Sequence, residues 1–170
     1  METTVLIALG SNRRHHRHGR PESVVRAAIV ALQACGMTLV AQSSIHPTAP
    51  VGPGGRRFAN AAVAVRTALA FPALLALLKA VERDFGRRPG RRWGDRVLDL
   101  DIIGAGQAVL ATPGLRIPHP QLANRRFVLD PLVEIAPGWR HPRCHATVRQ
   151  LRARAMRPMA RVRVGRRAGP

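Results

Sequence analysis

The stretch RWGDRVLDLD, residues 92–101, holds three of the nine acidic residues of a 170-residue chain whose formal net charge is +19. Two of the three, Asp99 and Asp101, alternate with leucines, and this period of two predicts a β-strand. Because residues i and i+2 of a strand point to the same face, Leu98 and Leu100 should enter the core on the other face. The sequence therefore predicts two carboxylates about 6.5 Å apart along one side of a strand.

Carboxylates at this spacing suit a hard divalent cation. Mg²⁺ takes one or two carboxylates and completes its shell with water and phosphate oxygens. Two metal ions about 3.5 to 4 Å apart would fit between such residues and a polyphosphate. The alternative is a pair of solvated aspartates on an exposed strand face, and the spacing alone leaves both interpretations open.

The basic excess is almost entirely arginine, since Lys79 is the only lysine. Such a surface favours nucleic acid, acidic lipid or a phosphorylated small molecule. The apolar run at residues 5–9 is too short for a signal-peptide core or a membrane span, which indicates a cytoplasmic protein. We expect Cys35 to be a small core residue and Cys144 a loop thiol, without a disulfide between them.

The periodicity changes along the chain in the order strand, helix, strand, strand, helix, strand. The six expected elements are residues 4–9, 21–35, 37–44, 58–67, 72–85 and 98–103. This order fits a ferredoxin-like α+β sandwich, with an antiparallel four-stranded sheet (βαββαβ) and helices on one face. Pro47 and Pro50 predict an irregular segment after the second strand. Further on, a strand is possible within 107–110, and helical stretches are expected within 121–134 and 146–155.

We expect one domain, residues 1–155, followed by a basic and poorly ordered tail, residues 156–170. Three histidines stand among arginines in the loop 13–20. Because no acidic or cysteine residue accompanies them there, a solvated loop is expected rather than a metal site.

Several dispersed motifs occur in a fixed order over residues 4–137. They are Ala8–Asn12, Phe58–Ala61, Glu82–Arg87, Arg92–Gly94, Arg96, Asp99–Asp101, Pro118–Pro120 and Asn124–Phe127. Together they strongly resemble the 6-hydroxymethyl-7,8-dihydropterin pyrophosphokinase family. The resemblance implies a ferredoxin-like fold and the transfer of a pyrophosphoryl group from ATP to the pterin hydroxymethyl group, with release of AMP, in folate biosynthesis.

The same resemblance assigns roles to individual residues. The implied catalytic residues are Arg87, Arg96, Asp99 and Asp101, and the two aspartates would hold two Mg²⁺ ions. The implied pterin-binding residues are Thr48, Val51, Phe58, Asn60, Trp93 and Phe127. The implied ATP-binding residues are Glu82, Arg92, His119 and Arg125. Phosphoryl transfer needs mainly alignment and charge neutralisation, which metal ions and guanidinium groups supply.

We expect a monomer that acts on ATP and the pterin, with no nucleic-acid or membrane partner. One alternative is a basic RNA-binding domain of the same fold, but the chain has no tyrosine and lacks the aromatic signature of such modules. Another is an inactive member of the same family. For single residues, Phe58 and Phe127 as core rings, His119 as a turn residue and Arg87 as plain surface charge also remain open.

Overall fold

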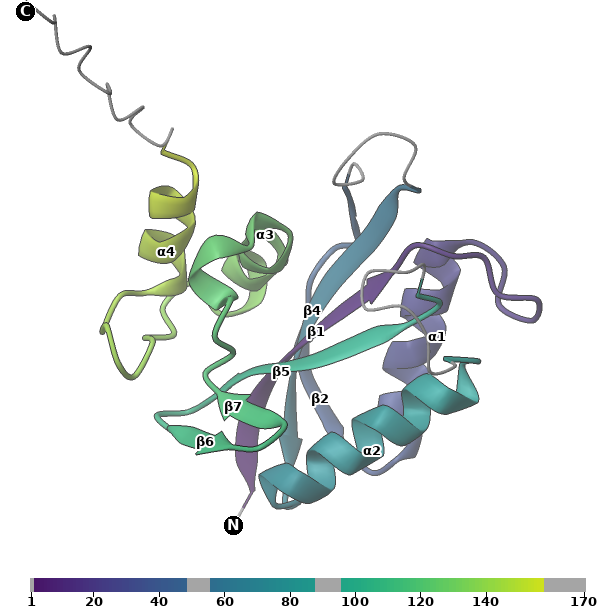
Figure 1. Cartoon of the computed structure of the whole chain (residues 1–170), viewed down its shortest axis with the longest axis horizontal. Helices are drawn as coiled ribbons and strands as arrows, with labels where there is room; N and C mark the ends of the chain where they lie inside the picture. Colours follow the sequence, from purple (N-terminus) through teal and green to yellow (C-terminus); the bar gives the residue numbers. More distant parts are fainter. Residues whose placement is uncertain (1, 49–55, 88–95, 158–170) are drawn as a thin grey trace, which may run out of the picture.

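Strand β1 (Thr3–Ser11) runs through the middle of an antiparallel sheet and pairs along its whole length with β4 (Phe58–Thr67). The computed structural model describes residues 2–48, 56–87 and 96–157 (Figure 1). β5 (Asp99–Ala105) pairs with the other side of β1, and β2 (Thr38–Gln42) pairs with β4. The order is β2-β4-β1-β5, so β5 stands at one end of it and can contact other elements along its free edge.

Helices α1 (Pro21–Ala34) and α2 (Phe71–Asp84) cover one face of this sheet (Figure 1). Each has a proline at the start of its first turn, where the missing N–H costs nothing. Gly36 and Gly86, with φ of +84° and +80°, follow their C-terminal ends, where the left-handed conformation favours glycine. Both predicted helices are confirmed.

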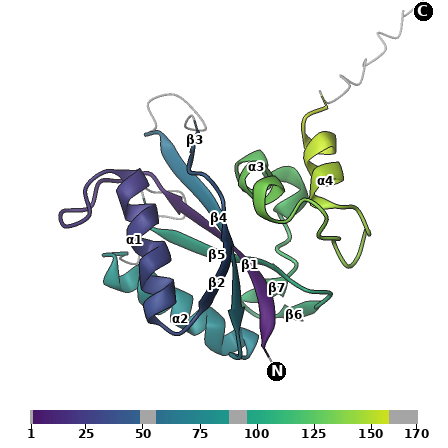
Figure 2. The same cartoon turned by 180° about the vertical axis from the view of Figure 1, so that it is seen from behind.

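The expectation of helices on one face holds for α1 and α2 of the βαββαβ core, but the opposite face of the sheet is also covered (Figure 2). The cover comes from the helical stretches expected within 121–134 and 146–155, whose place on the sheet was not predicted. Here α3 (Arg126–Ile135) and α4 (Val148–Ala155) enclose a second apolar cluster. The reason lies in β4, whose alternate residues Ala62 and Ala64 are buried under α3 although they belong to the face opposite α1. A strand that is apolar on both faces needs cover on both.

Two shorter features differ from expectation. Strand β3 (His46–Thr48) pairs with the start of β4, where an irregular segment was predicted. Pro47 is tolerated because β3 pairs only on its β4 side within the described residues. Instead of one strand within 107–110, a hairpin of β6 (Leu110–Thr112) and β7 (Leu115–Ile117) forms around Gly114, whose φ is +80°.

Gly104 lets the segment between α3 and α4 approach β5. A Cβ at this position would lie 2.5 Å from Cζ2 of Trp139, a separation that real side chains do not adopt. The Trp139 indole also donates a hydrogen bond of 3.0 Å to the carbonyl of Gly106. The glycine that interrupts the apolar end of β5 is therefore required by packing.

One of the two cysteine predictions is wrong. Cys35 is exposed at the end of α1, whereas Cys144 is exposed as expected. The loop 13–20 is largely exposed, as expected of a solvated loop, although His15 within it is buried. The centroid of the His15 ring lies 4.3 and 4.7 Å from those of His16 and His18, and its backbone forms a bridge to Gly19.

Within the described ranges, no helix has the length and apolar composition needed to cross a membrane. Residues 158–170 lie outside those ranges, so the expected disorder of the tail and the domain boundary at residue 155 stay predictions.

Candidate active site

One row of paired residues crosses the sheet on the face opposite α1 and α2. Asp99 pairs with Gly10, Gly10 with Asn60, and Asn60 with His46 of β3. Since paired residues point to the same face and neighbouring strands are about 4.8 Å apart, Asn60 and Asp99 flank Gly10 at a separation of roughly 10 Å. We call the surface of the sheet at Gly10, between Asn60 and Asp99, the floor of the site. A Cβ at Gly10 would approach Asn60 Oδ1 to 3.2 Å, so the absence of a side chain there keeps this floor open.

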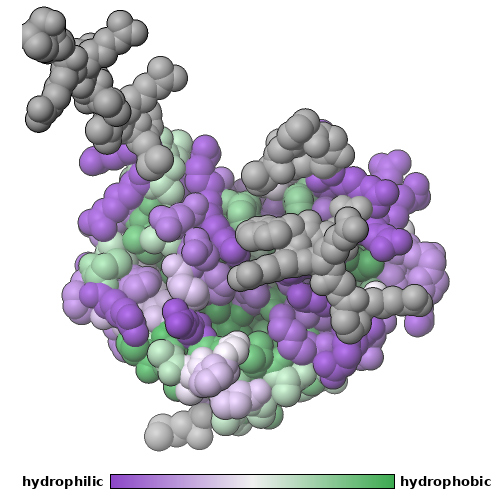
Figure 3. Space-filling view, in the orientation of Figure 1, coloured by the Kyte–Doolittle hydropathy of each residue, from purple (hydrophilic) through white to green (hydrophobic). Residues whose placement is uncertain are grey.

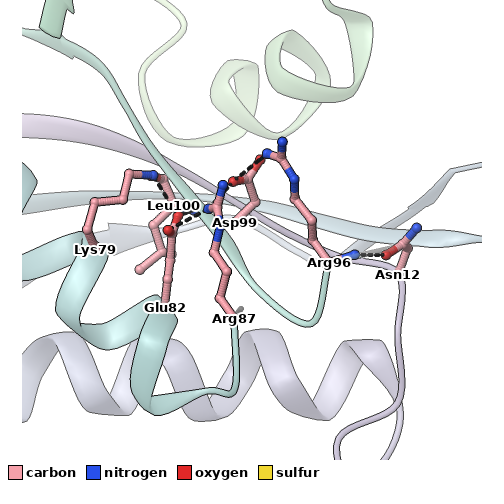
Figure 4. A network of polar contacts seen from close by, with 7 residues as sticks. All are labelled: Asn12, Lys79, Glu82, Arg87, Arg96, Asp99 and Leu100. Atoms are coloured by element: carbon pink, nitrogen blue, oxygen red, sulfur yellow. Dashed lines mark hydrogen bonds and ion pairs between the residues drawn. The ribbon is translucent and has the colours of Figure 1, made fainter. Parts of the chain in front are cut away.

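Two arginines hold the Asp99 carboxylate (Figure 4). Arg96 Nη1 donates to Oδ1 and Oδ2 at 3.0 and 2.9 Å, and Arg87 Nη1 donates to Oδ1 at 2.7 Å. Three predicted catalytic residues are therefore in direct contact. Both arginine side chains remain partly exposed, at 26% and 35%, so they are not merely buried counter-ions. Plain surface charge is not an adequate description of Arg87.

The carboxylate of Glu82 lies beneath this cluster and is only 1% exposed. Its Oε1 accepts hydrogen bonds from Lys79 Nζ at 2.8 Å and from the Leu100 N–H at 2.7 Å. Arg87 Nη1 lies 2.5 Å from Oε2 as an ion pair without hydrogen-bond geometry. Glu82 thus joins α2 to the free edge of β5. Its predicted contact with ATP stays a prediction, and its burial favours an indirect role.

Asn12 anchors the backbone of Arg96 (Figure 4). The Arg96 N–H donates to Asn12 Oδ1 at 2.8 Å, and the Asn12 N–H donates to the Arg96 carbonyl at 3.2 Å. Asn12 is buried directly after β1. Asn12 ends the motif Ala8–Asn12, but no role was predicted for its side chain from the sequence.

A cavity of about 630 Å³ opens beside β5, within the usual size range of small-molecule sites. Its lining includes Asp101 and His119, two predicted site residues that are 18 positions apart in the chain. The lining residues that were not predicted from the sequence include Leu75, Lys79 and Arg116. For the two on α2 a signal existed, because positions 75, 79 and 82 share one side of a helix.

His119 is held in a defined orientation at this cavity. The backbone N–H of His119 donates to the Ile103 carbonyl at 2.9 Å, and Nδ1 of its ring accepts from the backbone N–H of Gln121 at 3.1 Å. Burial lowers the pKa of His119, opposed by Asp101 and Asp99 and reinforced by Arg125. Since Nδ1 is already used as an acceptor, the neutral ring carries its proton on Nε2 and can donate it to a ligand. These contacts exceed those of a simple turn residue.

On the side of the floor away from Asp99 lie uncharged predicted pterin-binding residues, which we call the neutral wall: Thr48, Phe58, Asn60 and Phe127. Asn60 Nδ2 donates to Thr48 Oγ1 at 2.7 Å, which orients the amide and leaves Oδ1 toward Gly10. Phe58 is half-buried on the same strand. Phe127, in the first turn of α3, is 38% exposed, and the Arg125 guanidinium lies 5.7 Å from its ring centroid. An exposed ring at this position does not fit the alternative of a core residue.

The residues present fit a divalent cation. Asp101 is partly exposed and lines the cavity, and its carboxylate receives no hydrogen bond or ion pair from any described residue. Such a carboxylate is unusual in a protein of net charge +19 and matches the ligand preference of Mg²⁺. Within the described ranges, no group of three or more His, Cys, Asp or Glu residues is placed to hold a metal ion, so water and ligand oxygens would have to complete the shell.

Three predicted site residues, Val51, Arg92 and Trp93, lie outside the described residues, and their roles stay predictions. The basic loop 13–20 is not part of the cavity lining. Hydrophilic side chains gather at the side of the molecule from which this loop projects (Figure 3). The loop contacts the end of α2 through Phe85, whose ring centroid lies 4.9 Å from that of His18 and 6.1 Å from that of His15.

A site that combines aspartates, arginines and an adjoining cavity on an antiparallel sheet is typical of an enzyme that handles a phosphorylated small molecule. Residues 6–137 match the family model described as 7,8-dihydro-6-hydroxymethylpterin-pyrophosphokinase (HPPK). The chain belongs to this family.

Named relatives agree with this membership. A 2-amino-4-hydroxy-6-hydroxymethyldihydropteridine pyrophosphokinase of Pseudomonas aeruginosa is 41% identical over 140 residues, which cover 81% of this chain and 83% of that protein. One of Synechocystis is 38% identical over 146 residues, covering 86% and 73%. A folate synthesis bifunctional protein of Arabidopsis thaliana is 42% identical over 135 residues, but only 24% of its length is matched.

The fold is similar to that of a Plasmodium falciparum HPPK-DHPS crystal structure, with a TM-score of 0.70 at 13% identity. The match covers 91% of this chain and 45% of that one, so this chain spans less than half of the solved structure. At this identity the likeness establishes the fold alone.

Proposed function

We propose that the protein transfers a pyrophosphoryl group from ATP to the hydroxymethyl group of 6-hydroxymethyl-7,8-dihydropterin, releasing AMP, as a step of folate biosynthesis. Family membership over residues 6–137 supports this reaction. The observation that carries it for this chain is the row Asn60–Gly10–Asp99, which sets an amide for a heterocycle and a carboxylate for the phosphates on either side of an open floor.

The neutral wall would bind the pterin. A flat heterocycle stacks on aromatic rings, which is worth about 0.5 to 1.5 kcal/mol beyond burial, and an amide supplies both a donor and an acceptor to its polar edge. We assign the rings to Phe58 and Phe127 and the amide to Asn60. The Thr48 hydroxyl would act through Asn60, because it already holds the amide nitrogen.

The cavity beside β5 would bind the nucleotide, with His119 and Lys79 as donors to its phosphates or ribose. Asp99 and Asp101 would hold two Mg²⁺ ions, which when bound neutralise phosphate charge. Arg87 and Arg96 both donate to Asp99. Binding of a cation at Asp99 would exchange these partners, so that both guanidinium groups turn to the transferred phosphates while Asp99 turns to the cation.

The strand order supports a ferredoxin-like fold as part of this proposal. Strands β1, β2, β4 and β5 are the first to fourth strands of the core pattern βαββαβ. In space they follow the order β2-β4-β1-β5, which is second, third, first, fourth, and each neighbouring pair is antiparallel. A monomer in the cytoplasm belongs to the same proposal, and light scattering checks the oligomeric state.

The alternatives are not supported. An RNA-binding sheet of this type presents aromatic side chains on an open face, whereas here α3 and α4 cover part of the face opposite α1 and α2. An inactive family member would be expected to lose catalytic residue types, but Arg87, Arg96, Asp99 and Asp101 are all present.

The test is to incubate the protein with ATP, Mg²⁺ and 6-hydroxymethyl-7,8-dihydropterin and to separate the nucleotides. AMP should accumulate in a one-to-one ratio with a pterin product carrying two phosphates. Formation of ADP with a monophosphorylated pterin, or no pterin-dependent turnover, would reject the proposal.

A further inference from the structure

Three polar side chains connect β3 and the segment before it to α3, although they are about 90 positions apart in the chain. Glu134 Oε1 accepts from Ser44 Oγ at 2.8 Å and lies 2.6 Å from His46 Nε2. Glu134 Oε2 accepts from the Ser44 N–H at 2.7 Å, and Ser44 Oγ lies 3.2 Å from the His46 ring nitrogen. His46 ends the row of paired residues described above, and the other two members, Ser44 and Glu134, have no role in the site considered so far.

The residue types are those of a hydrolase triad, but the arrangement is different. In a triad the acid contacts one ring nitrogen and the nucleophile the other, so that the histidine can relay a proton. Here Ser44 and Glu134 both contact Nε2, and the Ser44 hydroxyl donates to the carboxylate. The serine is therefore not activated, and the cluster acts by holding its members together.

The cluster stands at the end of the row that forms the proposed site. His46 pairs with Asn60 and precedes Thr48 by two residues, so its strand supplies the hydroxyl that orients the Asn60 amide. Glu134 follows Phe127 by seven residues, which places the two side chains on the same side of α3 two turns apart. The cluster thus joins the strand that orients the amide to the helix that carries the ring.

Its effect on stability should be modest. His46 and Glu134 are 29% and 37% exposed, and ion pairs at such exposure stabilise a fold little. Burial raises the pKa of Glu134, but the hydrogen bonds from Ser44 and His46 outweigh this and leave the pKa below its ordinary value. The carboxylate is therefore ionised near neutral pH and accepts all of these bonds at once. The cluster therefore fixes the position of β3 relative to α3 more than it stabilises the fold.

We propose that Ser44, His46 and Glu134 form a clamp that sets the distance between Phe127 and Asn60 and so the width of the pterin slot. The three are positioning residues, since none needs to touch the pterin. This inference rests on the proposed function.

The variant Glu134→Gln tests the clamp, because the amide keeps the shape but offers one acceptor oxygen where the carboxylate offers two. Asp130→Asn is the matched control: it lies one turn away on the same helix and binds Arg152 of α4 rather than β3. Pterin affinity should fall about tenfold in Glu134→Gln, less than the ~10²-fold cost of a 1 Å misplacement in a reacting complex. Affinity for a non-hydrolysable ATP analogue should not change, and the control should keep both affinities.

Hydrogen exchange of the Ser44 amide, measured without substrates, separates the possible failures. Faster exchange in Glu134→Gln, together with the selective loss of pterin affinity, supports the clamp. Faster exchange with unchanged pterin affinity overturns it, as does an equal loss of pterin affinity in Asp130→Asn. If the unaltered protein binds no pterin, the proposed function fails and the clamp's role in it fails too, whatever the exchange rates.

Discussion

The two sides of the candidate site are built in opposite ways. On the β5 side, arginines, carboxylates and one lysine contact one another within residues 79–101, as Arg87, Arg96 and Asp99 do. On the β3 side, the contacts are neutral or peripheral and join segments far apart in the chain, such as Ser44 and Glu134.

This difference separates what each side can do. Ion pairs at partly exposed positions exchange partners readily, so the β5 side can give its charges to an incoming polyphosphate and cation. The Asn60 amide is buried and already oriented by Thr48, so the β3 side offers a fixed shape to a flat ring. Substitutions on the two sides should therefore affect different steps.

The largest effect is expected at the aspartates. Asp101→Asn and Asp99→Asn should each lower AMP formation at least ~10²- to 10³-fold, the usual cost of one preorganised electrostatic group, while pterin binding without nucleotide is kept. The measurement is turnover across a Mg²⁺ titration, beside a melting curve. Asp130→Asn, away from the cavity, is the control. A mutant that retains more than about a tenth of normal turnover rules out the metal role for that aspartate.

Substitution of the arginines should lower turnover less than substitution of the aspartates, and only Arg87 should also affect stability. Arg96→Ala should lower the chemical step toward the lower end of that ~10²- to 10³-fold range with little change in nucleotide affinity. Arg87→Ala should also lower the melting temperature, because it removes a cation from buried Glu82. Single-turnover kinetics and thermal unfolding measure the two effects. Equal losses of affinity and rate would identify the arginines as simple phosphate anchors.

A weaker and selective effect is expected at the aromatic wall. Phe127→Ala should raise the pterin dissociation constant about 2- to 13-fold, which corresponds to the 0.5 to 1.5 kcal/mol of a stacked ring. Calorimetric titration with the pterin, and separately with an ATP analogue, measures this. A parallel fall of both affinities and of the melting temperature would instead assign Phe127 to the core.

The smallest effect concerns acid stability. Because the folded-state pKa of Glu134 is lowered, its contacts add stability above the unfolded-state pKa and lose it as the pH falls through the folded-state value. The unaltered protein should therefore melt slightly higher than Glu134→Gln at pH 7, and this gap should close in acid. A gap that stays constant down to pH 3 would show that ionisation of Glu134 contributes nothing.

The strand with two aspartates was predictable because alternation is a local signal: Leu98 and Leu100 are fully buried and both aspartates lie on the other face. The helical stretches within 121–134 and 146–155 were expected, but their packing on the sheet was not, because the small buried residues Ala62 and Ala64 are equally compatible with a half-exposed strand. Only tertiary packing distinguishes the two cases.

Single-residue contacts were predictable where a motif existed and not elsewhere. Asp99, Arg87 and Arg96 were all named, but not their contact with one another, since ion pairing depends on how α2 meets β5. The Ser44–Glu134 connection has no local signal at all, because the two residues are 90 positions apart.

The most direct test of the two-sided account measures both affinities on two variants in one experiment. Asn60→Ala and Lys79→Ala are compared with the unaltered protein by titration with the pterin and with a non-hydrolysable ATP analogue. The account predicts a crossed pattern: Asn60→Ala weakens pterin binding alone, and Lys79→Ala weakens nucleotide binding alone. If each variant lost both affinities equally, or if Asn60→Ala weakened the nucleotide instead, the division of the site into a neutral pterin side and a charged nucleotide side would be contradicted.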